Sequence, residues 1–136
     1  NLLKKGGNKY MLKAKALDQN ATKWIYNLTG LAIDSIGNIT CFMHDMNGHK
    51  HKIITSTLCY ESPIPNLYEN DIICFANDSS LDSYIVKIME TNNNDKDLLF
   101  VLVSRKDFSV IDLSSINPQN IIKITNIYEK TRHVRW

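Results

Sequence analysis

Long apolar runs and secretion signals are missing from this sequence. Nowhere in its 136 residues does an apolar run approach the roughly 20 residues that a transmembrane helix needs. The lysines near the start are not followed by an apolar stretch, as a signal peptide would require. Only three cysteines are present, and an odd number without a secretion signal favours reduced thiols in a cytosol. We therefore expect a cytoplasmic protein without a membrane partner.

Catalytic motifs are also missing. The sequence contains no Gly-X-Ser-X-Gly, no P-loop, no Gly-X-Gly-X-X-Gly and no His-Glu-X-X-His. Cys59 and Cys74 are candidates for a catalytic thiol, but Cys74 lies in the apolar run 72–75, where a buried and inert thiol is expected. We predict no enzymatic activity and no cofactor. A cysteine-based or metal-dependent enzyme is the alternative.

Helical periodicity, heptads and internal sequence repeats are absent, whereas apolar and polar residues alternate in many short runs. Such runs, separated by turn residues, predict a mainly β protein with meander hairpins and little or no helix, folded as a small barrel or roll. In the first run, Lys13 and Lys15 are expected on an exposed side. A short helix near Ser114 would be limited by Pro118. The predicted strands cover residues 11–17, 24–33, 39–46, 49–57, 71–75, 84–90, 98–103 and 121–128.

Asn47-Gly48 is the strongest turn signal in the chain. The two residues separate two predicted strands, and both tolerate the positive φ that a two-residue type I′ turn requires. This turn fixes the register of the hairpin, and the side chains of three pairs would then share one face. The expected pairs are His44 with His51, Met46 with His49, and Phe42 with Ile53.

Cysteine and histidine gather around the same hairpin. Cys41 and His44 have a spacing found in zinc sites, and His49 and His51 could complete four ligands. The expected register argues against this site, because Cys41 would pair with Ile54 on the opposite face from His44. We therefore predict no metal centre. An open site made by His44 and His51 alone would be adventitious.

Charge is unevenly distributed along the chain, although the formal net charge is only +2. Residues 61–97 contain eight acidic residues and two lysines, so the protein is not a uniformly basic nucleic-acid binder. Besides His44 and His51, two groups of side chains are candidates for binding. Trp24 and Tyr26 share one face of a strand, where a place in the core is the alternative. The tail contributes Lys130, Arg132, Arg135 and Trp136, which could touch phosphate and stack a base, and a frayed, solvated C-terminus is the favoured alternative.

Three stretches of the chain, KAKALD with KWIY (13–26), NLYENDII (66–73) and ITNIYE (124–129), taken in this order resemble the YopX-type family of bacteriophage proteins. KAKALD followed by KWIY, within residues 13–26, is similar to the family's opening "R-A-W-D…K-W-V-Y". NLYENDII, residues 66–73, resembles its central "E-I-Y-E-G-D-I-V", and ITNIYE, residues 124–129, resembles its closing "I-G-N-I-Y-E-N". The resemblance covers about residues 11–130.

The resemblance implies a phage or prophage origin, hence the cytoplasm of a bacterial host, and a small β-roll of the Src-homology-three (SH3) type. It implies no activity and no catalytic residues, because the family has no characterised function. Asn70 stands where the family has Gly, so we expect positive φ there, with Asp71 bonding into the turn and starting a strand. Residues 59–65 depart from the family's pattern, which puts in doubt anything the family binds through that loop.

These observations lead to one architecture and two main functions. We expect a disordered leader over residues 1–10, a single YopX-like β domain over 11–130 and a basic tail over 131–136, with Met11 as the natural first residue. The favoured function is a non-catalytic phage accessory module that binds a host or phage protein or associates with itself through strand edges. The alternative is a DNA- or RNA-binding module of phage early or replication functions.

Overall fold

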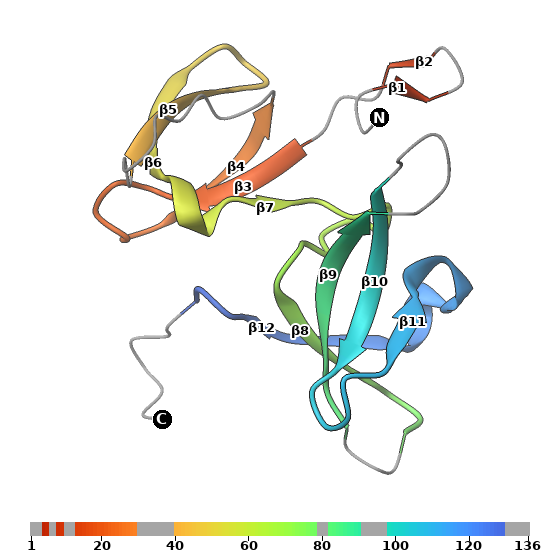
Figure 1. The fold of residues 1–136 in the computed structure, drawn as a ribbon. Helices are drawn as coiled ribbons and strands as arrows, with labels where there is room; N and C mark the ends of the chain where they lie inside the picture. Colours follow the sequence, from red (N-terminus) through yellow and green to blue (C-terminus); the bar gives the residue numbers. More distant parts are fainter. Residues whose placement is uncertain are drawn as a thin grey trace. The chain divides into compact units, whose positions relative to one another are not determined.

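The computed structural model describes residues 4–5, 8–9, 13–29, 40–78, 82–90 and 98–129. The chain divides into two compact units, unit 1 (Asn1–Glu61) and unit 2 (Ser62–Trp136). Each unit contains one five-stranded antiparallel sheet, so the protein is mainly β, as predicted (Figure 1). No helix in these ranges has the length and apolar character needed to cross a membrane.

Unit 1 is a meander whose last strand returns to the first. The sheet order is β6-β5-β4-β3-β7, and a 3₁₀ turn, η1 (Thr55–Thr57), links β6 to β7. The inward side chains of this sheet form an apolar core of Ala14, Ala16, Leu28, Cys41, Met43 and Ile53. The strands are β3 (Lys13–Leu17), β4 (Trp24–Thr29), β5 (Thr40–Asp45), β6 (Lys50–Ile54) and β7 (Cys59–Tyr60).

Unit 2 contains the longer strands. The sheet order is β11-β10-β9-β8-β12, and two 3₁₀ turns, η2 (Leu113–Ser115) and η3 (Pro118–Asn120), precede β12. Asp112 caps η2 by accepting from the Ser114 N–H at 2.9 Å. The core contains Leu67, Ile73, Val86, Leu102 and Leu113. The strands are β8 (Asp71–Phe75), β9 (Tyr84–Glu90), β10 (Leu98–Ser104), β11 (Val110–Asp112) and β12 (Ile121–Asn126).

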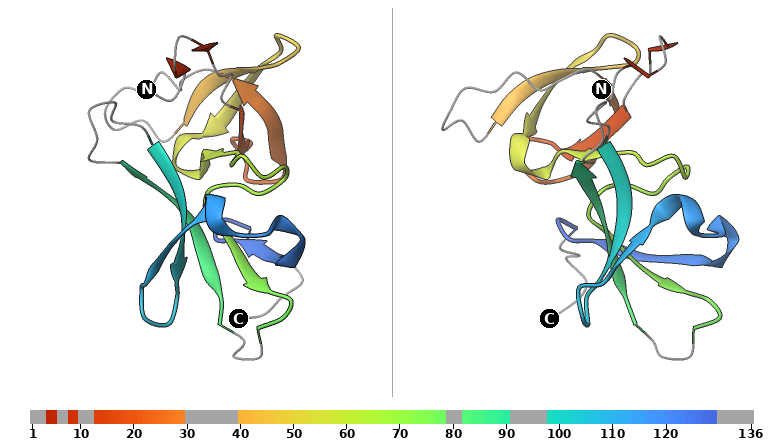
Figure 2. Two further views of the ribbon diagram at one scale, coloured as in Figure 1. Left: turned by 90° about the vertical axis from the view of Figure 1, so that its right-hand side faces the viewer. Right: turned by 45° about the vertical axis from the view of Figure 1, so that its right-hand side comes forward.

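The two units share one topology. In each, the first strand lies between the second and the fifth, strands two to four form a meander, and 3₁₀ turns join the fourth strand to the fifth (Figures 1 and 2). Within the described ranges neither sheet closes into a full ladder; in unit 1 a single bridge joins Asp18 to Ile53 of β6. The chain therefore repeats a fold plan without repeating a sequence.

The predicted register of the β5–β6 hairpin is wrong by one residue. Phe42 pairs with Lys52, Met43 with His51 and His44 with Lys50. Three residues, Met46 to Gly48, link Asp45 to His49, and the Gly48 N–H donates to the Asp45 carbonyl at 3.0 Å. Gly48 has φ +83°, as expected, whereas Asn47 is outside the left-handed region. The turn is thus the three-residue type, with glycine alone at the left-handed position.

Several predictions concern parts of the chain that the structure describes little or not at all. In the first ten residues, β1 (Lys4–Lys5) pairs with β2 (Asn8–Lys9), and the leader stays a prediction. The single domain over 11–130 also stays a prediction. The tail residues Lys130, Arg132, Arg135 and Trp136 lie outside the described residues.

Candidate functional site

Lysines and aromatic side chains gather on the outward face of the unit 1 sheet. Strand pairing places Thr29 opposite both Lys13 and His44, and His44 opposite Lys50, so these residues share a face. Because neighbours alternate, this face is opposite the one that carries Ala14, Cys41 and Met43. The face also carries Lys15, Trp24, Tyr26, Phe42 and Lys52.

The exposed centre of this face is a ring with two ammonium groups beside it. Phe42 is 53% exposed, and Lys50 Nζ and Lys52 Nζ lie 4.8 and 5.7 Å from its ring centroid. His44, also exposed, follows Phe42 on the same side of β5. We call these four residues, Phe42, His44, Lys50 and Lys52, the Phe42 face. It offers an apolar ring and two cations to solvent, and Asp45, the acidic residue of β5 and β6, lies on the other side of the sheet beside His51.

A second cluster lies on β3 and β4. The Lys15 ammonium is 4.3 Å from the centroid of the Trp24 ring and 5.7 Å from that of Tyr26. Lys15 is only 1% exposed, so its predicted exposure is wrong. The residue lies at a bulge, where Tyr26 and Asn27 together oppose it, and Asn27 adopts φ +59°. Trp24 is half-buried and Tyr26 is 48% exposed. The two predicted aromatic side chains therefore pack against the Lys15 ammonium group and are only partly accessible to a ligand.

His44 and His51, two of the candidate binding residues, point to opposite faces. His44 is on the Phe42 face, whereas His51 turns inward beside Asp45, with 2.8 Å between His51 Nε2 and Asp45 Oδ2. The expected pairing of the two is therefore wrong. Cys41 faces inward beside Met43, away from His44. Within the described ranges no three His, Cys, Asp or Glu side chains are grouped to hold a metal ion.

Asp45 has a structural role in the hairpin. Its Oδ1 accepts from the N–H groups of Asn47 and His49, at 2.9 and 3.0 Å. The hydrogen bond with the His51 side chain, followed by these backbone bonds, lowers the pKa of Asp45 to about 2. The carboxylate thus fixes the turn at the end of the Phe42 face.

The acidic residues of the chain are concentrated in the other unit. Unit 1 contains eight lysines and four acidic residues. All of the acids of residues 61–97 except Glu61 belong to unit 2. Glu61 itself lies 3.6 Å from Lys13 Nζ. The acidic residues in the middle of the sequence therefore do not contribute to the charge of the Phe42 face, because nearly all of them belong to unit 2.

In unit 2, the central and closing stretches of the family resemblance meet in a buried polar network. Asp71 is fully buried, and its two oxygens accept from the Tyr68 N–H at 2.8 Å and from the Asn126 amide at 2.9 Å. Asn70 has φ +71°, as expected, and accepts from Lys87 Nζ at 2.7 Å. The bonds tie β8 to β12, which favours a structural reading of both stretches.

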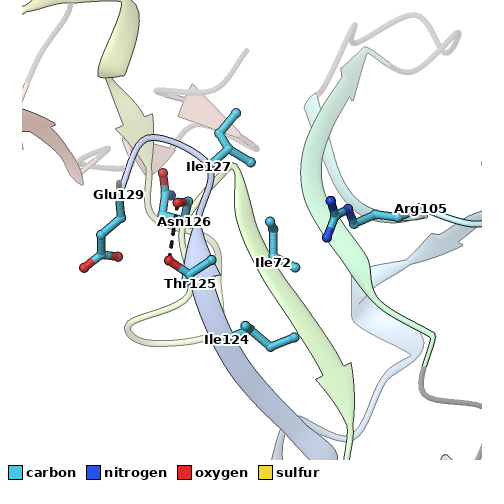
Figure 3. A pocket seen from close by; sticks show the side chains of 7 residues that line it. All are labelled: Ile72, Arg105, Ile124, Thr125, Asn126, Ile127 and Glu129. Atoms are coloured by element: carbon cyan, nitrogen blue, oxygen red, sulfur yellow. Dashed lines mark hydrogen bonds between the residues drawn. The ribbon is translucent and has the colours of Figure 1, made fainter. Parts of the chain in front are cut away.

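A pocket of ≈ 370 Å³ opens beside this network. Ile72, Ile124 and Ile127 make its apolar wall, and Arg105 reaches it from the opposite side (Figure 3). Glu129 extends from the chain just after β12, beyond the isoleucines as seen from Arg105. We call this the isoleucine pocket, lined by Ile72, Arg105, Ile124, Thr125, Asn126, Ile127 and Glu129.

Sequence reasoning missed Phe42, Lys50 and Lys52 as site residues. The signal that could have found them is the alternation of each strand combined with a turn beginning at Asp45. An Asp shortly before Asn-Gly favours a turn in which the Asp carboxylate accepts hydrogen bonds from backbone N–H groups. Comparisons of the chain with family models, with curated proteins and with solved structures give no match.

Proposed function

We propose that unit 1 binds single-stranded nucleic acid through the Phe42 face. The observation that carries this proposal is the exposed Phe42 ring with the ammonium groups of Lys50 and Lys52 within 6 Å of its centroid. A base stacked on an exposed aromatic side chain contributes about 1–3 kcal/mol. Lysines beside the ring are placed to neutralise the phosphates on either side of that base.

The charge of the unit supports a nucleic acid over a protein as the ligand of this face. The sequence totals favour a protein partner because residues 61–97 are acidic, but those residues lie almost entirely in unit 2. Unit 1 has a formal excess of four positive charges, from eight lysines and four acids. Binding of this kind is sequence-tolerant, since every base has an apolar face.

Fluorescence anisotropy with labelled oligothymidylate and oligouridylate tests the proposal. Phe42→Ala should weaken binding about tenfold at physiological salt, the loss expected of one stacked base. Phe108→Ala is the matched control, because Phe108 is 75% exposed but belongs to unit 2. Replacing Lys50 and Lys52 together by Ala should reduce the slope of log K against log salt by about 1.4, for two phosphates of a single strand.

Two results would reject this function. One is the absence of binding to either oligonucleotide at physiological salt. The other is an equal loss from Phe42→Ala and Phe108→Ala, which would show that binding does not use the Phe42 face.

A protein-binding role remains the second candidate, and it concerns unit 2. The observation that favours it is the row of exposed isoleucines at and after β12, where Ile122, Ile124 and Ile127 are 48, 55 and 40% exposed. Large apolar side chains grouped at the surface mark interaction sites. Neither candidate requires catalysis, and a non-catalytic role is part of the proposal.

We also propose that each unit is a small roll of the SH3 type and that the chain is related to the YopX-type phage proteins. The first point is supported by the strand order, in which the fifth strand follows a 3₁₀ turn and pairs with the first. The second is supported by the bond between Asp71 and Asn126, which joins two of the three similar stretches. The relationship would place the protein in the cytoplasm of an infected bacterium.

A further inference from the structure

The isoleucine pocket combines three features of an interface. Ile124 and Ile127 are exposed at its rim, although both are large apolar side chains. Ile124 is the extra residue of a bulge between β12 and β8, which turns it out of the ladder. Lys123, the only charged residue of β12, lies 3.6 Å from Asp71 and is not among the residues that line the pocket.

The charges around the pocket are arranged with a cation on one side and an anion on the other. Figure 3 shows Arg105 across from the isoleucines and Glu129 beyond them. In the described part of the chain no ion pair joins Arg105 to Glu129, and the one hydrogen bond of the Arg105 side chain there is to Ser83 Oγ, at 3.5 Å. Both charges are therefore available to a molecule that covers the isoleucines.

We infer that the isoleucine pocket is where a second copy of this chain binds, face to face, about a two-fold axis through the isoleucines. Such an axis brings the same patch of both copies together. It places Arg105 of each copy against Glu129 of the other, with apolar side chains between the two ion pairs. Ile124 and Ile127 of one copy are the side chains that would fill the pocket of its partner.

A second copy fits this patch better than an unrelated strand or peptide. A surface with one cation, one anion and apolar side chains between them is complementary to itself after a half-turn. A partner of a single charge sign would satisfy only one side of the pocket. The proposal does not depend on nucleic-acid binding, which uses unit 1.

Analytical ultracentrifugation of the full chain and of four variants tests the inference. Ile124→Lys should abolish the dimer, whereas Ile122→Lys should leave it intact, because Ile122 is similarly exposed on the same strand but does not line the pocket. Arg105→Glu and Glu129→Arg should each weaken the dimer about tenfold or more, since each replaces two attractions by two repulsions.

Mixing the two charge-reversal variants provides the decisive measurement. One copy then carries two glutamates and the other two arginines, so a mixed dimer regains both ion pairs and should form with close to the original affinity. Recovery on mixing also shows that both variants are folded. A chain that sediments as a monomer at all concentrations would overturn the inference, as would a mixture that stays monomeric. Loss of the dimer in Ile122→Lys as well as Ile124→Lys would instead indicate pairing through the edge of β12 and would also overturn it.

Discussion

The Asn126 side-chain amide donates a hydrogen bond of 2.9 Å to the carboxylate of Asp71, a residue 55 positions earlier in the chain. Both side chains are almost completely buried. Asn126 also donates to the Glu69 carbonyl at 3.2 Å and accepts from the Tyr128 N–H at 2.9 Å. One amide therefore satisfies groups on both sides of the contact between β8 and β12, where water cannot take its place.

Removing this amide should destabilise unit 2 strongly. Asn126→Ala removes the hydrogen bonds that this amide makes to a buried carboxylate oxygen and to backbone groups, and we expect a loss of about 2–4 kcal/mol in the free energy of unfolding. Urea denaturation followed by circular dichroism measures this loss. Gln119→Ala, at an exposed position in η3, should change it by less than about 0.5 kcal/mol. A loss for Asn126→Ala as small as that of the control would contradict the role of the network.

Asp45 should make the stability of unit 1 depend on pH in the acidic range. Its pKa of about 2, below the ordinary 3.8, means that folding favours the carboxylate. This contribution is complete above about pH 4 and is lost as the pH falls through about 2. The melting temperature of the unchanged protein should exceed that of Asp45→Asn by a constant amount at neutral pH, and the difference should shrink between pH 4 and 2. A difference that persists unchanged to pH 2 would exclude this linkage.

Gly48 tests the backbone of the β5–β6 turn. A Cβ added at Gly48 would meet no atom within 4 Å, so any cost of a substitution comes from its φ of +83°. Gly48→Ala should cost about 1–2 kcal/mol in the free energy of unfolding, and Gly48→Asn less, because Asn enters the left-handed region more readily. Urea titrations of both variants measure the two costs. Equal stability of the three proteins would show that the turn adopts another conformation.

Phe108 is held in an unfavourable conformation at an exposed position. It has φ +63° in the turn between β10 and β11 and is 75% exposed. Left-handed backbone at a bulky residue costs about 1–3 kcal/mol, and glycine avoids that cost. Phe108→Gly should therefore unfold at higher urea than Phe108→Ala, with a difference of about 1 kcal/mol, because both remove the ring and only one removes the strain. The reverse order would show that the backbone is not strained there.

The β5–β6 hairpin shows how far local chemistry predicts this fold. Asn47-Gly48 located the hairpin, because few other sequences allow so tight a reversal. The dipeptide is compatible with two-residue and three-residue loops. Asp45 selects the longer one by accepting the N–H groups of Asn47 and His49. The one-residue difference places Lys52 instead of Ile53 opposite Phe42. With the wrong register, the lysines beside Phe42 could not be recognised as part of a site.

Other features depend on contacts between distant segments and could not be predicted from local patterns. The alternation placed Lys15 on the outward side of β3, but its burial depends on how Trp24 lies over its ammonium group. Strand β7 has only two residues, too few for any pattern, although it completes the sheet of unit 1. The left-handed backbone at Asn70 was predictable from the resemblance, because the family has Gly at this position and Asn tolerates the same conformation.

The shared strand order also determines when each unit can be completed during synthesis on the ribosome. The fifth strand pairs with the first in both sheets, so one edge of the first strand lacks its partner until the last strand has left the exit tunnel. Contacts of such long sequence separation slow folding and prolong the exposure of apolar surface. In unit 2 the Asp71 carboxylate can form its buried hydrogen bond with Asn126 only after Asn126 has been synthesised. A ribosome that stalls before Asn126 therefore holds a unit that chaperones would recognise as unfinished.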